Sequence, residues 1–267
     1  MLNRKAKVFR PTAFAIPYIV LTVVFVVVPL FLVLLYALRG DDGSFTFENF
    51  KYVFTDEGNI EKLWQTIRLA AISTAICLLI AYPTAFVLAS KPFNKMAILA
   101  LLFIIPMWIN FMLRIFALQS LLTVIGIGNG DVAAVIGIVY DFFPYVLLPI
   151  YTVLSNMDKS YLEASRDLGA SNIGTFFRVT LPLSIPGVVS GVSMMFMPVF
   201  SAYSITKMMG SMETTVIGAK IATLFEYHDY GYGSALAFVL LVIVLIVLLI
   251  GTAITKATSK APQGGKS

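Results

Sequence analysis

Two charged residues, Arg114 and Asp141, interrupt long apolar stretches of this sequence. A charge inside a membrane-spanning segment is costly, so it usually faces a helix-bundle interior, a water-filled route or a partner of opposite charge. Two interpretations are open from the sequence. The two residues either pair with a neighbouring group to support the structure, or they line a path through the protein.

The sequence offers no set of residues for covalent or metal chemistry. His228 is the sole histidine and Cys77 the sole cysteine, so neither a metal cluster nor a disulfide is expected. The glycine series at 126, 128 and 130 lacks the Lys-Ser/Thr pair of a phosphate loop. We therefore predict no catalytic residue, no metal site and no bound cofactor, and an intramembrane enzyme is the weakest interpretation.

The polar segment 158–171 contains the signals of a short helix. Ser160 stands three residues before Glu163, which predicts a capping box with Ser160 as N-cap. Gly169 is the residue type that ends helices in the left-handed conformation. We expect a short helix between these two signals.

A second helix is expected directly afterwards, with Ser171 as its N-cap. Apolar residues recur along it, and Pro182 and Pro186 predict the point where it gives way to the next apolar span. The helix-turn-helix would be too polar for lipid and too apolar on one face to stand free in water. Such a surface indicates a protein partner, which a self-sufficient carrier or channel would not need.

The elements that hold these residues are predicted to cross a membrane. The 267 residues are 59% hydrophobic and only 12% charged, with a mean hydropathy of +0.90. This excludes an ordinary water-soluble domain. Runs of about 20 apolar residues can span a bilayer, and they predict an all-α polytopic membrane protein with six spans, at 13–38, 67–90, 96–122, 132–154, 184–206 and 235–255. Gly187 and Gly191 lie four residues apart within one span and predict close helix packing.

Charge distribution predicts the orientation of the spans. Six spans put both termini on the same side of the membrane. Lys and Arg are concentrated in the segments on that side, which places both termini in the cytoplasm. The net charge of +5 thus reflects membrane topology, and no nucleic-acid partner is expected. We predict a cytoplasmic N-terminus at 1–12, a six-helix domain at 13–257 with a cytoplasmic loop at 155–183, and a disordered tail at 258–267.

The loop resembles a known motif. Glu163-Ala164-Ser165, Gly169 and the later Leu181-Pro182 look like the EAA loop of bacterial ABC importer permeases, with Ser165 where a third alanine is usual. The resemblance implies a type I ABC importer permease fold and a helix that docks into a cytoplasmic ATPase. The positions that it assigns to this coupling contact are Glu163, Ala164, Ser165, Asp167, Gly169 and Ala170.

The likeness extends to the spans. The segment 106–110, Arg114, Tyr140 and the segment 144–151 resemble the first permease subunit of spermidine/putrescine importers. That resemblance implies a second permease subunit, an ABC ATPase dimer that binds the ATP, an extracytoplasmic solute-binding protein and a polyamine substrate in a bacterial inner membrane. An amino acid, an oxyanion or an opine-like solute stays open as the cargo.

A polyamine would be bound by aromatic rings and carboxylates, which attract ammonium groups. Trp108 lies beside Pro106 and Asn110, so it is either an interfacial anchor or part of the substrate route. The excess of acidic residues in the outer segments also fits ordinary topology. The hypothetical route comprises Trp108, Asn110, Arg114, Tyr140, Asp141, Tyr203, Glu226 and Asp229.

Overall fold

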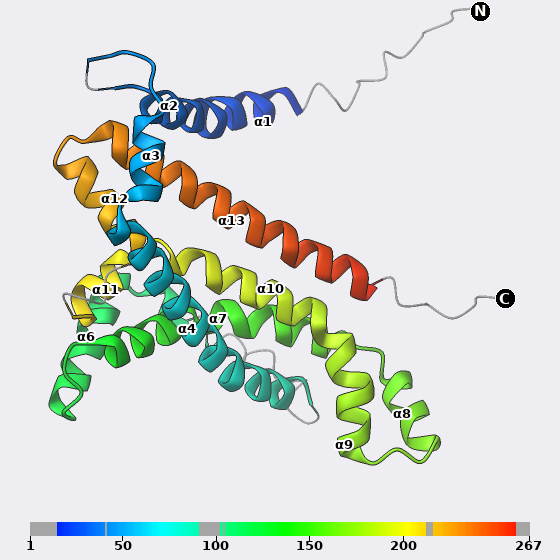
Figure 1. Cartoon of the computed structure of the whole chain (residues 1–267). Helices are drawn as coiled ribbons and strands as arrows, with labels where there is room; N and C mark the ends of the chain where they lie inside the picture. The colour runs from blue at the N-terminus through cyan, green and yellow to red at the C-terminus, as the bar shows by residue number, and fades with distance from the viewer. Residues whose placement is uncertain (1–14, 41, 91–101, 104, 212–215, 260–267) are drawn as a thin grey trace, which may run out of the picture. The chain divides into compact units, whose positions relative to one another are not determined.

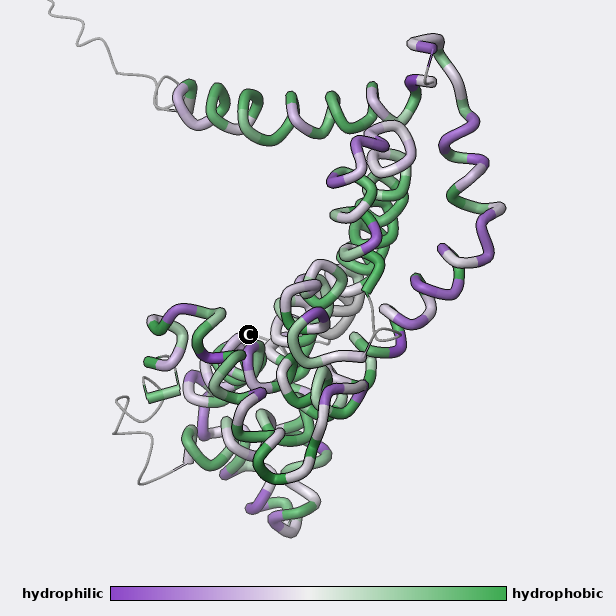
Figure 2. The backbone as a smooth tube through the Cα atoms, turned by 90° about the vertical axis from the view of Figure 1, so that its left-hand side faces the viewer, coloured by the Kyte–Doolittle hydropathy of each residue, from purple (hydrophilic) through white to green (hydrophobic). Residues whose placement is uncertain are grey.

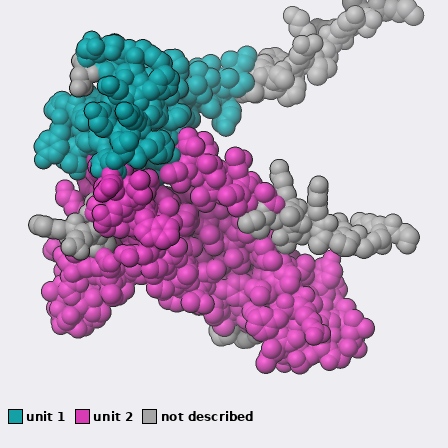
Figure 3. Space-filling model, in the orientation of Figure 1, with its two compact units in different colours: residues 1–56, 221–241 teal, residues 57–220, 242–267 magenta. Residues whose placement is uncertain are grey.

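The computed structural model describes residues 15–40, 42–90, 102–103, 105–211 and 216–259. These residues form helices and connecting turns, and the sole β-type pairing among them is an isolated bridge between Arg39 and Phe45. The all-α prediction is confirmed. The chain divides into two compact units, residues 1–56 with 221–241 and residues 57–220 with 242–267 (Figure 3).

The first unit begins with one continuous rod made of α1 (Ala15–Thr22), a single π turn (η2, Val23–Val27) and α2 (Val28–Ala37). Hydrophobic residues predominate along the rod (Figure 2), and nearly all of its described side chains are exposed. A helix that is apolar on all sides is stable in lipid or against other apolar helices. The rod therefore has the character of a membrane span.

The same unit holds α3 (Glu48–Thr55) and the beginning of α13 (Tyr230–Ser259). Phe50 of α3 meets Phe238 of α13 edge to face, with 6.0 Å between ring centroids. The side-chain nitrogen of Asn49 donates to the carbonyl oxygens of Ala37 and Arg39, at 3.1 and 2.9 Å. These contacts join α3 to the end of α2 and to α13.

The second unit is organised around α7 (Asp131–Ser155), which packs along both α4 (Glu57–Ala89) and α10 (Leu181–Val199) (Figure 1). Gly191 of α10 lies against the α7 backbone, because a Cβ placed there would be 2.9 Å from the carbonyl oxygen of Val146. A Cβ at Gly187 would be equally close to the carbonyl oxygen of Pro149. The close packing predicted for Gly187 and Gly191 is confirmed.

Shorter helices complete this unit: η4 (Ile105–Trp108), α6 (Phe111–Val124), α11 (Tyr203–Met209) and the start of α12 (Ile217–Glu226). The α11 helix packs on α7 at Gly137, where a Cβ would be 2.9 Å from Ile205 Cγ2. Gln119 of α6 donates to the carbonyl oxygen of Met208. Side chains from α6 and α11 thus brace one end of α7.

Five helices in the described residues are long and apolar enough to cross a membrane: Ile16–Ala37, Glu57–Ala89, Asp131–Ser155, Asn172–Val199 and Tyr230–Ala253. They correspond to five of the six predicted spans, although two of them, Glu57–Ala89 and Asn172–Val199, begin 10 and 12 residues before the expected 67 and 184. Of the remaining span, predicted at 96–122, the structure describes only the shorter α6 as a regular helix. Residues 96–101 of that span, residues 1–12 and most of the tail at 258–267 lie outside the described residues, and α13 continues to Ser259.

Candidate functional site

The loop between α7 and α10 forms a helical hairpin of α8 (Lys159–Asp167) and α9 (Asn172–Thr175) (Figure 1). The N-cap of α8 is Asp158, whose carboxylate accepts a hydrogen bond from the Ser160 backbone N–H at 2.9 Å. The prediction of Ser160 as N-cap was therefore wrong, because an aspartate two residues earlier provides the acceptor. Hydrogen bonds from the Ser160 backbone and side chain lower the pKa of Asp158.

Both signals at the turn of the hairpin act as predicted. Gly169 adopts φ +82°, the left-handed conformation that ends α8. The hydroxyl of Ser171 then accepts from the Gly174 backbone N–H at 3.1 Å and caps α9. Each helix end therefore follows from a residue beside it in the sequence.

The helix that begins at Asn172 does not stop at the prolines. It passes through a π turn at Phe176–Thr180 (η5) and continues as α10 to Val199. α10 begins at Leu181 with Pro182 in its first turn, so the expected change to the next span occurs at Pro182, whereas Pro186 lies inside α10. The second arm of the hairpin and the following span are one continuous helix.

A hydrogen bond between the Ser165 and Thr175 hydroxyls, 3.1 Å apart, fastens the two arms of the hairpin. Thr175 is buried, with 3% of its surface exposed. Sequence reasoning missed Thr175, and the one available signal was the serine in place of the usual alanine at position 165. The serine adds a polar link between the arms.

The other residues proposed for coupling are accessible: Glu163, Ala164, Asp167 and Gly169 are exposed and Ala170 is partly exposed. Large apolar side chains are exposed on the hairpin and at the start of η5, which follows it. Leu168 is 89% exposed, Ile173 72% and Phe177 61%. An apolar surface of this kind on a polar hairpin is typical of a protein-binding face.

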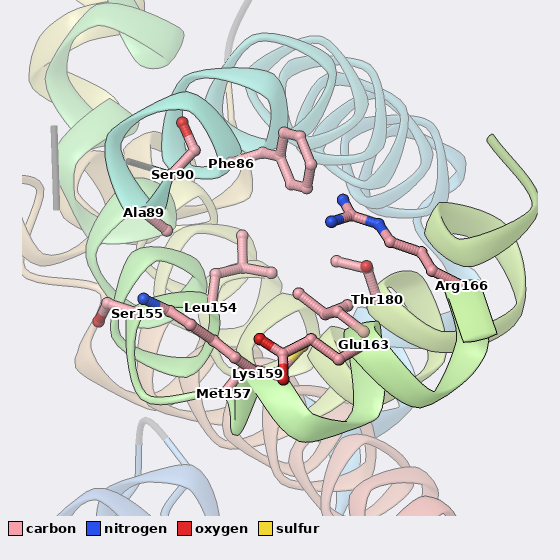
Figure 4. Close-up of a pocket in the computed structure, with 11 residues that line it drawn as sticks. Phe86, Ala89, Ser90, Leu154, Ser155, Met157, Lys159, Glu163, Arg166 and Thr180 are labelled. Carbon is pink, nitrogen blue, oxygen red and sulfur yellow. The ribbon is translucent and has the colours of Figure 1, made fainter. Parts of the chain in front are cut away.

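A pocket of about 340 Å³ lies between α8, the end of α4 and the end of α7. Glu163 and Arg166 extend from α8 towards its interior, opposite Phe86 of α4 and Ser90, the residue after α4 (Figure 4). Lys159 also lines it. Glu163 is therefore placed where the hairpin meets the ends of two long helices.

The two charges within the spans form an ion pair. Arg114 Nη2 of α6 lies 2.6 Å from Asp141 Oδ1 of α7, and both side chains are 10% exposed. The Arg114 guanidinium also lies 6.0 Å from the ring centroid of Tyr140. The structure thus forms the pairing that was one of the two interpretations, and it brings together three of the eight residues proposed for the route.

The remaining route residues have separate surroundings. Trp108 is 89% exposed, and the Asn110 side chain caps α6 by accepting from the Met112 backbone N–H at 2.9 Å. The Tyr203 ring faces Lys207 Nζ at 5.7 Å, so a cation of the chain itself lies over this ring. Glu226 and Asp229 are exposed and belong to the first unit.

Comparison with known proteins identifies the family. Residues 81–260 match the family described as "binding-protein-dependent transport system inner membrane component". The chain is 31% identical to the spermidine/putrescine transport system permease protein PotB of Escherichia coli over 239 residues, which cover 80% of this chain and 86% of that protein. It is 30% identical to PotB of Haemophilus influenzae, with 85% and 87% covered.

Solved structures show the same fold. A bacterial alginate ABC transporter in complex with an alginate pentasaccharide-bound periplasmic protein matches with TM-score 0.73 at 14% identity, covering 93% of this chain and 94% of that one. The inward-facing MetNI methionine ABC transporter matches with TM-score 0.58 at 18% identity, covering 74% and 95%. The family match over residues 81–260 and the identity to the curated relatives show that the chain belongs to the family of inner membrane components of binding-protein-dependent transport systems.

Proposed function

We propose that this chain is one of two permease subunits of an ATP-driven importer that carries polyamines, spermidine or putrescine, into a bacterial cell. The names of the curated relatives support the cargo. In this proposal the chain lies in the cytoplasmic membrane with both termini inside, and it hydrolyses no ATP itself. A dimeric ABC ATPase binds and hydrolyses the nucleotide.

The observation that carries the proposal is the exposed hairpin α8–α9. An N-cap on each helix and the Ser165–Thr175 hydrogen bond give the hairpin a defined conformation. Leu168 and Ile173 remain exposed on it as apolar surface. Free apolar surface on an ordered hairpin favours docking into a cleft of another protein. We assign this docking to the ATPase, with Glu163, Ala164, Ser165, Asp167, Gly169 and Ala170 at the contact.

The transport path is proposed to run beside the Arg114–Asp141 pair. A solute-binding protein would deliver the polyamine from the outer side, and ATPase closure would move the hairpin and change which side of the path is open. Asp141 would attract an ammonium group, while its pairing with Arg114 keeps the resting site near neutral. Trp108, Asn110, Tyr140, Tyr203, Glu226 and Asp229 complete the proposed route.

The test is transport by the reconstituted complex. The chain is purified with its copurifying subunits, placed in vesicles with ATP inside and the binding protein outside, and supplied with labelled putrescine or spermidine. Glu163→Ala combined with Gly169→Ala should lower both ATPase copurification and uptake at least tenfold. Asn172→Ala, an exposed change on the same hairpin, serves as the control.

Each outcome addresses a different part of the proposal. Wild-type uptake that needs ATP supports the importer, and uptake without ATP contradicts it. A bound ATPase with no polyamine uptake would reject the cargo. Full uptake by the double variant would reject the docking surface.

A further inference from the structure

The first unit contains a pocket of about 570 Å³ between the end of α3 and the turn that joins α12 to α13. Its wall consists largely of aromatic and acidic side chains. The lining residues are Asn49, Tyr52, Asp56, Tyr227, His228, Asp229 and Tyr232.

Tyr232 connects the two carboxylates of the pocket. Its hydroxyl donates to Asp56 Oδ2 at 2.8 Å, and its backbone N–H donates to Asp229 Oδ1 at 3.2 Å. Both carboxylates are thus held in position by contacts with the same residue.

The pocket combines acidic carboxylates with aromatic rings. Neither lysine nor arginine is among its lining residues. Tyr52 is 61% exposed and Tyr227 80% exposed, so both phenol side chains are accessible. Ring faces and carboxylates both attract a cation, and their combination favours an organic ammonium.

A metal ion fits the pocket less well. Among the described residues, no three histidine, cysteine, aspartate or glutamate side chains are grouped to hold a metal. Tyrosine rings attract alkylammonium groups through their faces, whereas a small metal ion requires several oxygen or nitrogen ligands at once.

We propose that this pocket is a binding site for a primary alkylammonium group, with Asp56 and Asp229 as the charge partners and Tyr52 and Tyr227 as aromatic walls. Its location on the outer side of the membrane rests on the proposed function. Two sources present this group there: a free polyamine, or a lysine side chain of the docked solute-binding protein. All of its lining residues belong to the first unit, and Asp229 is the one that it shares with the proposed route.

The first arm of the test measures binding of free diamine. The complex is placed in nanodiscs without ATP or binding protein, and binding of labelled putrescine is measured by equilibrium dialysis. Asp56→Asn with Asp229→Asn removes both charges but keeps the amide oxygens that can accept from Tyr232, and Asn preserves a capping side chain before α13. Glu48→Gln is the matched control, because Glu48 is an exposed acid on α3 that does not line the pocket.

We expect the double variant to weaken one class of putrescine sites by at least tenfold, while the control changes it less than twofold. Unlabelled 1,4-butanediol, which lacks the ammonium groups, should not compete. The second arm adds the binding protein and a carbodiimide, which joins carboxylates to lysine amines. A cross-link that requires Asp56 or Asp229 identifies the lysine source.

Either a variant-sensitive diamine site or a variant-sensitive cross-link supports the ammonium pocket. Unchanged diamine binding together with an unchanged or absent cross-link overturns it, as does displacement of the diamine by magnesium at equal concentration. These results are independent of the transport assay. Polyamine uptake with no pocket effect rejects only the pocket, and pocket binding without polyamine uptake rejects only the cargo.

Discussion

The hairpin α8–α9 and the packed helices α4, α7 and α10 belong to the same unit but are stabilised in different ways. The hairpin is defined by residues that lie beside each other in sequence: Asp158 and Ser171 cap its helices, and Gly169 turns the chain. The packed helices are defined by residues far apart in sequence, such as Gly191 against Val146. Local hydrogen bonds shape the first region, and backbone approach shapes the second.

Because of this difference, the conformation of the hairpin does not depend on burying its side chains. The hairpin keeps large apolar side chains exposed because caps and turns, and not a core, determine its conformation. The packed helices have no such freedom, since a side chain added at Gly191 meets backbone atoms. A change in the core should therefore affect the whole unit, whereas a change in the hairpin should stay local.

The largest effect is expected at the buried ion pair. Asp141→Ala leaves the Arg114 guanidinium without its partner at a site where both side chains are 10% exposed. Removing one member of a buried pair costs about 3–5 kcal/mol. The melting temperature of the detergent-purified complex should fall strongly, and Arg114→Met combined with Asp141→Leu should recover much of the loss. A double variant no more stable than the single one would show that the pair is not the cause.

A smaller but still global effect is expected at Gly191. Gly191→Ala places a Cβ 2.9 Å from the carbonyl oxygen of Val146, so α10 must shift away from α7. Overpacking of this kind costs about 1–3 kcal/mol. Gly128→Ala is the control, because a Cβ there meets nothing within 4 Å. Equal melting temperatures for the two variants would contradict the close approach.

Gly169→Ala tests the local character of the hairpin. A Cβ at Gly169 meets nothing within 4 Å, but φ +82° is unfavourable for alanine by about 1–2 kcal/mol. Hydrogen exchange should become faster in residues 159–175 while the global melting temperature stays close to that of the wild type. Gly169→Asn should have less effect, because asparagine tolerates this conformation. A clear fall in the global melting temperature would argue against a local role.

The smallest effect is a pH dependence at Asp158. Hydrogen bonds from the Ser160 backbone and side chain lower the pKa of this carboxyl below its ordinary value. A depressed pKa in the folded state means that the stabilisation is present above the unfolded-state pKa and is lost as pH falls through the folded one. Exchange in residues 159–163 should increase below about pH 4. Asp158→Asn should reduce that change, and an identical pH response in both proteins would exclude Asp158 as its source.

The sequence was most informative where one residue determines a local conformation. Gly169 and Ser171 could be assigned correctly because a left-handed turn and an N-cap depend on neighbouring atoms. Ser160 was misassigned because Asp158 competes for the same cap and a pattern of residue types does not reveal which side chain wins. Five apolar helices could be predicted from hydropathy because a membrane span requires one continuous apolar run, which is visible in the sequence itself.

Contacts across long sequence distances were harder to predict. Arg114 and Asp141 were recognised as costly charges, but their pairing depends on how α6 packs against α7. Thr175 has no distinctive sequence pattern and gains its role only when the hairpin folds beside Ser165. The pocket at Asp56 and Asp229 likewise needs two segments more than 170 residues apart, joined through Tyr232.

The helix from Asn172 to Val199 gives the hairpin a mechanical connection to the core. Its 28 residues follow a helical path roughly 40 Å long that bends between α9 and α10 (Figure 1). Its first turn lies in the hairpin, and Gly191 farther along packs against α7. A force applied to the hairpin would therefore be transmitted to α10 through continuous helical backbone. The π turn at Phe176–Thr180 is the place along this helix where the hydrogen-bond register changes. It would act as a hinge that determines how much of a hairpin movement reaches the membrane helices.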